Sequence, residues 1–172
     1  MSLVFFLHTE PCDVTKVLSA MTLQTDLLTT SFAQLRDRDT EFTQAFYSTL
    51  FANYPQVQPL FKTTQMEEQA RKLFASLVLV VNNLTKPEAL TPALQGLGTR
   101  HIQYGVLPEH YPMVGQTLLK AMAVTLKDQW TPDVEAAWTE AYSAIAAIML
   151  DGADYSPEIL NPHTPTSTLV NQ

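Results

Sequence analysis

The stretch LTPALQGLGTRHIQYGV, residues 90–106, places a histidine on an otherwise apolar helical stripe. Leu90, Leu94 and Leu97 follow the spacing of one helix face, and His101 comes four residues after Leu97 on that face. A polar side chain on an apolar face costs free energy unless it finds a partner. Two interpretations are open at this point: a core histidine that bonds a backbone carbonyl, or a ligand of a metal.

The composition indicates one globular domain with an acidic surface. The 172 residues are 46% hydrophobic and 16% charged, which favours a packed core over disorder. Ten Lys and Arg stand against 17 Asp and Glu, a net charge of −7, so we expect neither a nucleic-acid partner nor an anionic membrane surface. The single cysteine, Cys12, excludes an intrachain disulfide, and no apolar run approaches the roughly 20 residues of a membrane span. We therefore expect a cytoplasmic protein.

Apolar spacing predicts an all-α fold. Most Pro and Gly residues stand where helices would begin or end. The expected helices cover about residues 23–36, 42–54, 64–84, 90–101, 108–126 and 131–149. Thr64-Gln65-Met66-Glu67 matches a capping box, and Thr131 before Pro132 is typical of a helix start.

Composition divides the chain into three parts. Residues 1–22 are predicted to be a loosely ordered N-terminal extension, and residues 23–151 to hold the helical domain. Residues 152–172 are rich in Pro, Ser and Thr and lack helical periodicity, so we expect a C-terminal tail.

Two more polar side chains lie on apolar helix faces. Tyr47 follows Phe46 on a helix dense with aromatics, and Gln69 lies between Met66 and Leu73 on the next one. Each has a structural alternative, a boundary tyrosine with its hydroxyl at the rim and a glutamine that faces water. The common motifs of phosphate-binding loops, zinc proteases and serine hydrolases do not occur. With His101, these side chains would suit an apolar cofactor with a polar reactive centre.

Five stretches, taken in order, resemble the globin family. They are Phe46-Tyr47 through Tyr54-Pro55 to Phe61, Gln69 to Leu73, Leu97 to Val106, Tyr111 to Leu119, and Ala137-Trp138 to Tyr142. The resemblance covers residues 31–150 and is closest to bacterial single-domain haemoglobins, the globin domain of flavohaemoglobins, and neuroglobin. It implies a globin fold, a 3-over-3 helical sandwich around a b-type haem.

The resemblance also implies a role for particular residues. His101 would be the iron ligand, and Tyr47 and Gln69 would point at the distal ligand of the iron. The residues expected to contact the haem or support His101 are Phe61, Leu73, Leu97, Val106, Lys72 and Tyr111, with Arg71 as a second cation for a haem propionate. Gln69 in place of a distal histidine favours the flavohaemoglobin type over the bis-histidine type.

Two departures from flavohaemoglobins bear on function. Those proteins support the proximal histidine with a Tyr–Glu pair; Tyr111 matches the tyrosine, but only Asp151 or Asp154 could replace the glutamate. The chain also shows no flavin or nicotinamide reductase portion, so a separate reductase is the expected partner, and the protein would be a monomer or a homodimer.

The resemblance therefore implies a haem protein that binds O2, NO and CO. Oxygen binding or transport is one expected role, and nitric oxide detoxification as a dioxygenase with an external reductase is another. A gas or redox sensor and a haem-free scaffold of the same fold are the alternatives.

Overall fold

The computed structural model describes residues 24–155 and residue 159, so the predictions for residues 1–22 and most of the tail lie outside the described residues. Helices form all the regular structure that is described, which confirms the all-α prediction. The α-helices are α2 (Thr25–Arg36), α3 (Asp39–Asn53), α4 (Met66–Asn82), α5 (Pro87–Gln103), α6 (His110–Leu126) and α7 (Pro132–Gly152), and the 3-10 helices are η2 (Pro55–Phe61) and η3 (Lys127–Gln129).

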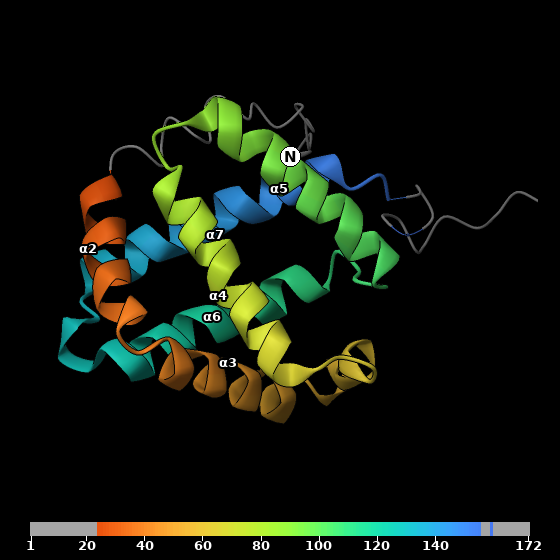
Figure 1. The fold of residues 1–172 in the computed structure, drawn as a ribbon, viewed down its shortest axis with the longest axis horizontal. Helices are drawn as coiled ribbons and strands as arrows, with labels where there is room; N and C mark the ends of the chain where they lie inside the picture. The colour runs from red at the N-terminus through yellow and green to blue at the C-terminus, as the bar shows by residue number, and fades with distance from the viewer. Residues whose placement is uncertain (1–23, 156–158, 160–172) are drawn as a thin grey trace, which may run out of the picture.

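The helices cross one another at steep angles, with α4 running diagonally across the front of Figure 1 and α6 and α7 behind it. Helix α5 packs mainly against α7, whereas α4 packs against α2 and α3. The helices that carry Gln69 and His101 are therefore held by different partners and make little backbone contact with each other. None of the helices within residues 24–155 is long and apolar enough to cross a lipid bilayer.

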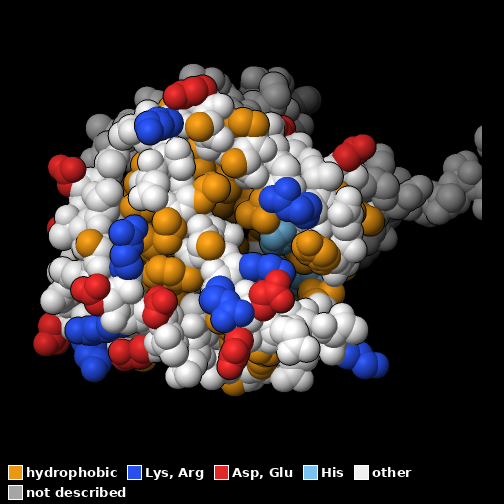
Figure 2. Space-filling view, in the orientation of Figure 1, with side chains coloured by type: hydrophobic (Ala, Val, Ile, Leu, Met, Phe, Trp, Pro, Cys, Tyr) orange, Lys and Arg blue, Asp and Glu red, His pale blue; other side chains and the backbone are white. Residues whose placement is uncertain are grey.

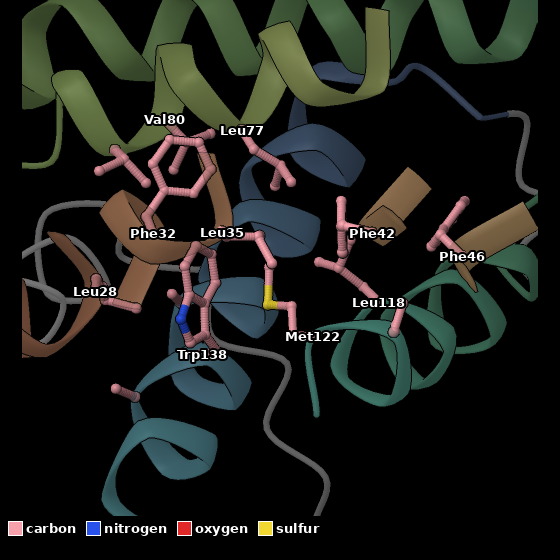
Figure 3. Close-up of a cluster of buried hydrophobic side chains, with 14 of the residues drawn as sticks. Leu28, Phe32, Leu35, Phe42, Phe46, Leu77, Val80, Leu118, Met122 and Trp138 are labelled. Carbon is pink, nitrogen blue, oxygen red and sulfur yellow. The ribbon is translucent and has the colours of Figure 1, made fainter. Parts of the chain in front are cut away.

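Side chains from α2, α4 and α7 pack together in the core, where Figure 3 shows Phe32, Leu77, Val80 and Trp138. The ring of Phe32 stacks on that of Phe74 at 5.4 Å and lies 6.3 Å from the Trp138 ring. The buried indole N–H of Trp138 donates to the Ser31 hydroxyl at 2.9 Å, so this polar group has a partner. The three helices are thus joined away from the end that carries His101.

One predicted helix start is confirmed and the other is wrong. The Thr131 hydroxyl accepts the backbone N–H of Val134 at 3.3 Å, as an N-cap should. The capping box at Thr64 does not form, because α4 begins at Met66 after an extended Gln65 that makes no side-chain cap bond. Glu67 instead lies in the first turn, where its charge favours the helix dipole.

The packed domain continues past the boundary predicted at residue 151. Helix α7 ends at Gly152, and beyond it Ala153 and Tyr155 are both 6% exposed. Apolar periodicity could not show this, because a single aromatic that docks after a helix end has no period.

Glycines let α5 and α7 approach until their backbones touch. A Cβ at Gly98 would collide with the carbonyl of Met149, and one at Gly152 would collide with the backbone of Gln95. The Thr99 hydroxyl adds a 2.9 Å bond to the Gly152 carbonyl. His101 lies one helical turn after Gly98, so this contact fixes the depth at which its side chain sits.

Replacing Gly98 should therefore destabilise the protein where replacing its neighbour does not. Gly98→Ala is expected to lower the free energy of unfolding by roughly 1–3 kcal/mol, because the opposing backbone has no rotamer to relieve the overlap. Gly96→Ala is the matched control: its Cβ would meet only the Arg100 side chain at 3.8 Å, and we expect a gain of about 0.5–1 kcal/mol. Urea unfolding measures both, and equal effects of the two variants would contradict the close contact.

Candidate functional site

His101 is half-buried on α5 and its ring has a defined tautomer. The ring Nδ1 lies 2.9 Å from the Leu97 carbonyl oxygen. Because a carbonyl only accepts, Nδ1 carries the proton and Nε2 keeps its lone pair in the neutral ring. Burial lowers the pKa of His101 below its usual range, with the Leu97 bond acting in the opposite direction. The ring thus bonds a carbonyl through Nδ1 and keeps an Nε2 lone pair that a metal could accept. The two interpretations that the sequence left open are therefore compatible.

The turn after His101 is a Schellman cap. The Val106 N–H donates to the His101 carbonyl at 3.0 Å, and the Gly105 N–H donates to the Ile102 carbonyl at 2.9 Å. Gly105 has φ of +76°, a left-handed conformation that favours glycine. The cap satisfies the backbone of His101 and turns the chain sharply toward α6.

Tyr47 on α3 meets Gln69 on α4. The Tyr47 hydroxyl lies 3.5 Å from the Gln69 carbonyl oxygen, at the outer limit of a hydrogen bond, and its side chain is 8% exposed. Burial raises the pKa of Tyr47 to about 12, while the Gln69 side chain acts in the opposite direction. The phenol therefore keeps its proton at neutral pH and can donate it. The structure brings this predicted pair together.

The segment η2 joins the Tyr47 side of the site to the His101 side. The ring of Phe61 packs edge-on against Tyr47 at a centroid distance of 5.8 Å. The neighbouring Leu60 side chain lies against Gly105, in the cap that follows His101. Phe61 thus contacts Tyr47, and the residue before it contacts the cap that follows His101.

The apolar side chains that are predicted to contact the haem are only partly buried. Phe61, Leu73, Leu97 and Val106 each pack against the core and each keep exposed surface. Figure 2 shows an apolar-lined hollow with a histidine side chain at its edge and Lys and Arg side chains around it. Such a site suits a flat, largely apolar ligand with acidic groups at its rim.

The two predicted cations differ in position. The Lys72 ammonium pairs with the Glu68 carboxylate at 2.7 Å, and both side chains are exposed. The Glu68 carboxylate raises the pKa of Lys72 above its usual range. Arg71 instead lines a groove of about 710 Å³ between α3 and α4, which Tyr47 also lines. The structure thus pairs Lys72 with a carboxylate and places Arg71 in this groove.

The residues that lie behind the His101 ring differ from the Tyr–Glu pair that the resemblance implies. The ring of Tyr111 lies 6.2 Å from that of His101, and its buried hydroxyl has no hydrogen-bond partner of ordinary geometry among the described residues. Asp151 and Asp154 are both exposed, and the Asp151 carboxylate accepts from Gln95 at 3.0 Å. Neither carboxylate replaces the glutamate, because burying an unpaired carboxylate beside Tyr111 would be costly.

Sequence reasoning missed Tyr155, which lies near Tyr111. Burial, and then the neighbouring hydroxyl of Tyr155, raise the pKa of Tyr111 above its usual range. The signal in the sequence was weak: an aromatic side chain next to Pro-rich residues, in a segment without periodicity.

Sequence comparison relates the chain to haem proteins. The model of the globin family matches residues 44–149. Flavohemoprotein of Deinococcus radiodurans is 37% identical over 110 residues, which are 63% of this chain and 27% of that protein. Flavohemoprotein of Rhodopirellula baltica is 31% identical over 124 residues, 70% of this chain and 30% of that protein. The chain thus matches less than a third of the length of these relatives.

Solved structures of similar fold come from bacteria. A globin of Campylobacter jejuni superposes with a TM-score of 0.61 and 25% identity, covering 80% of this chain and 94% of the other. An engineered carbene transferase, made from a Rhodothermus marinus protein assigned as a nitric oxide dioxygenase, gives a TM-score of 0.64 and 28% identity over 72% of this chain and 85% of the other. These matches confirm the predicted globin fold.

The residues present fit a haem. The neutral imidazole of His101 offers Nε2, and the half-exposed apolar side chains of η2, α4 and α5 offer contact area to a macrocycle. Within residues 24–155, His, Cys, Asp and Glu side chains do not gather in groups of three that could hold a metal ion. The chain belongs to the globin family, and its cofactor is haem b.

Proposed function

We propose that this globin binds dioxygen, nitric oxide and carbon monoxide, with His101 as the iron ligand and with Tyr47 and Gln69 facing the gas. The observation that carries the proposal is the burial of the Tyr47 phenol on α3, with its hydroxyl 3.5 Å from the main-chain carbonyl of Gln69 on α4. When bound, the haem supplies a ferrous iron with one open coordination position for a diatomic gas.

His101 would hold the iron through Nε2. Its Nδ1–H bond to the Leu97 carbonyl fixes the ring about its long axis, and the cap at Gly105 holds the backbone below it. A carbonyl partner leaves the imidazole neutral, so it is a moderate electron donor compared with one that bonds a carboxylate.

Tyr47 and Gln69 would hold the gas. A phenol O–H and an amide N–H2 are donors, and a donor in a pocket of low dielectric binds a polarised acceptor more strongly than it would in water. Phe61 restricts the Tyr47 ring from the edge, so the phenol does not need to be ordered when the gas binds.

We propose further that the protein removes nitric oxide as a dioxygenase. Nitric oxide, dioxygen and one electron together give nitrate, so each turnover needs one electron. The electron would come from a flavin reductase outside residues 24–155. The Rhodothermus relative, which is described as a nitric oxide dioxygenase, supports this reaction class. A stress-related scaffold that binds no haem is the alternative that the first experiment below excludes.

His101→Gly should lose most of its haem, because the iron–imidazole bond is the one strong covalent anchor of the cofactor. The Soret absorbance per protein measures the loss, and imidazole added to the medium should restore part of it. His110→Ala is the control, since the His110 ring only accepts the Leu107 N–H in the next turn. Full haem content in His101→Gly would make the ligand assignment wrong, and no Soret band in the wild type would favour the scaffold.

Tyr47→Phe should speed the release of dioxygen by about 10- to 150-fold, and Gln69→Leu by less. The range corresponds to the loss of one hydrogen bond to a charged acceptor, roughly 1.5–3 kcal/mol. Stopped-flow mixing with carbon monoxide measures the rate. Tyr54→Phe is the matched control, because its hydroxyl bonds Gln116 at 2.8 Å outside the site. Rates equal to wild type in both site variants would show that neither side chain faces the gas.

The 172-residue chain, loaded with haem and dioxygen, should convert one equivalent of nitric oxide per haem and then stop in the ferric state. Addition of a flavin reductase with NADH should restore continuous consumption, because that reaction supplies the missing electron. A nitric oxide electrode and a nitrate assay follow both phases, with the reductase alone as the control. Continuous consumption with NADH and no reductase would contradict the proposed source of electrons.

A further inference from the structure

A small polar pocket lies where the corner between α2 and α3 meets the end of α6. Its volume is about 230 Å³, and it is lined by Gln34, Asp37, Arg38, Leu126 and Gln129. Leu126 is buried and closes the pocket on the side of the core, whereas the other four side chains are polar or charged. None of these residues lines the groove beside Tyr47. The pocket is therefore separate from the candidate haem site.

Gln34 brings an unsatisfied oxygen to this pocket. Its side-chain oxygen Oε1 is buried and has no hydrogen-bond partner among the described residues. An amide oxygen that is buried without a donor costs free energy, and native structures leave few such atoms unpaired. A bound molecule with an N–H donor would supply the missing partner.

Two opposite charges line the pocket without pairing with each other. The Arg38 Nη1 donates to the main-chain carbonyl of Thr125 at 2.6 Å, which holds the guanidinium at the end of α6 and leaves its other N–H groups free to donate. Among the described residues the one ion pair joins Lys72 and Glu68, so the neighbouring Asp37 carboxylate does not pair with Arg38. The pocket thus offers an anchored cation for an anionic group and a carboxylate for a cationic one.

One wall of the pocket is a strained turn. Leu126 and Gln129, which line the pocket, flank Lys127, and Lys127 has a φ of 52°, the one positive φ among the described non-glycine residues. Its N–H donates to the Ala123 carbonyl, and its carbonyl accepts from the Trp130 N–H at 2.9 Å, so the strained conformation is held. Backbone strain of this kind concentrates at sites that bind ligands. The strain, the unpartnered oxygen and the anchored guanidinium all occur at this one pocket.

We propose that the pocket binds a small zwitterion of the free amino acid type. Its carboxylate accepts from Arg38, and its ammonium donates to the Asp37 carboxylate and to Gln34 Oε1. A plain anion would be repelled by Asp37 and a plain cation by Arg38, so a molecule that carries both charges fits best. At roughly 30 Å³ for each water-sized group, the pocket holds about eight such groups, the size of a small amino acid such as L-alanine. The proposal is independent of the haem and of the role of His101.

Titration of the full chain with L-alanine, followed by proton–nitrogen NMR, tests the proposal. The side-chain amide signals of Gln34 and Gln129 and the backbone amide signal of Lys127 should shift and saturate. We expect a dissociation constant in the millimolar range, because both ion pairs are open to water. L-Alanine at about ten times that constant should also raise the Tm by roughly 3–6 °C.

Two further probes separate the two charges of the ligand. Propionate lacks the ammonium and L-alanine methyl ester lacks the carboxylate, so each should bind about 2- to 5-fold more weakly than L-alanine. Arg38→Gln should weaken L-alanine binding by a similar factor and leave the binding of the methyl ester unchanged. Asp37→Asn should weaken L-alanine binding without weakening that of propionate. Because the Asp37 side chain bonds no other described residue, this variant tests the site without disturbing the fold.

Arg36→Gln is the matched control for Arg38→Gln. It removes a cation from the same end of α2, but the Arg36 guanidinium lies over the Phe32 ring, 5.7 Å from its centroid, and does not line the pocket. L-Alanine binding should be unchanged in this variant. Equal weakening in Arg36→Gln and Arg38→Gln, or equal binding of L-alanine and propionate, would overturn the proposal. The absence of saturable shifts with L-alanine would show that the pocket holds water only and would also overturn it.

Discussion

The direct contact of the α5 and α7 backbones is the constraint on which the site depends. Gly98 meets Met149, and Gly152 meets Gln95, so neither helix can slide along the other without a collision. His101 follows Gly98 by one turn and inherits its position from this contact. Close-packed interiors transmit such constraints because they have few alternative arrangements. Helices α4 and α5, in contrast, make little backbone contact with each other.

The two sides of the site are polar in different ways. On the α5 side, backbone carbonyls accept: Leu97 accepts from the His101 ring, and Val106 accepts from the Tyr155 phenol. On the α4 side, the Tyr47 phenol donates to the main-chain carbonyl of Gln69. Acceptors that bind the imidazole N–H keep Nε2 available, and donors on the other side suit an electron-rich ligand. The α5 side of the site therefore presents hydrogen-bond acceptors, and the α4 side presents a hydrogen-bond donor.

The spacing of apolar residues predicted the helices and the faces they bury. The six α-helices and the apolar stripe ending at His101 follow from repeated spacing, and the structure places each where the spacing indicates. The pairing of Tyr47 with Gln69 was instead an implication of the family resemblance. Failures occurred where a single contact decides. The capping box predicted at Thr64 does not form, because Gln65 is extended and α4 begins at Met66. The docking of Tyr155 beyond α7 depends on one tertiary hydrogen bond, which leaves no repeating pattern in the sequence. The position of the Lys72 side chain likewise depends on its ion pair with Glu68, which their separation of four residues on one helix allows but does not require.

The described interior contains no fully buried charged side chain. The polar groups of its buried side chains are the indole N–H of Trp138 and the hydroxyls of Ser31, Thr43, Thr117, Thr125, Tyr47, Tyr111 and Tyr155. The serine and threonine hydroxyls bond carbonyls of their own helices, so their dipoles are satisfied without counter-charges. Asp151 and Asp154, which could have supplied a carboxylate next to Tyr111, remain at the surface. Besides burial, the charge of the exposed Arg100 acts on His101 and also lowers its pKa. Salt screens this exposed charge and hardly affects the buried dipoles. For the buried hydroxyls, geometry rather than ionisation is therefore the property that matters.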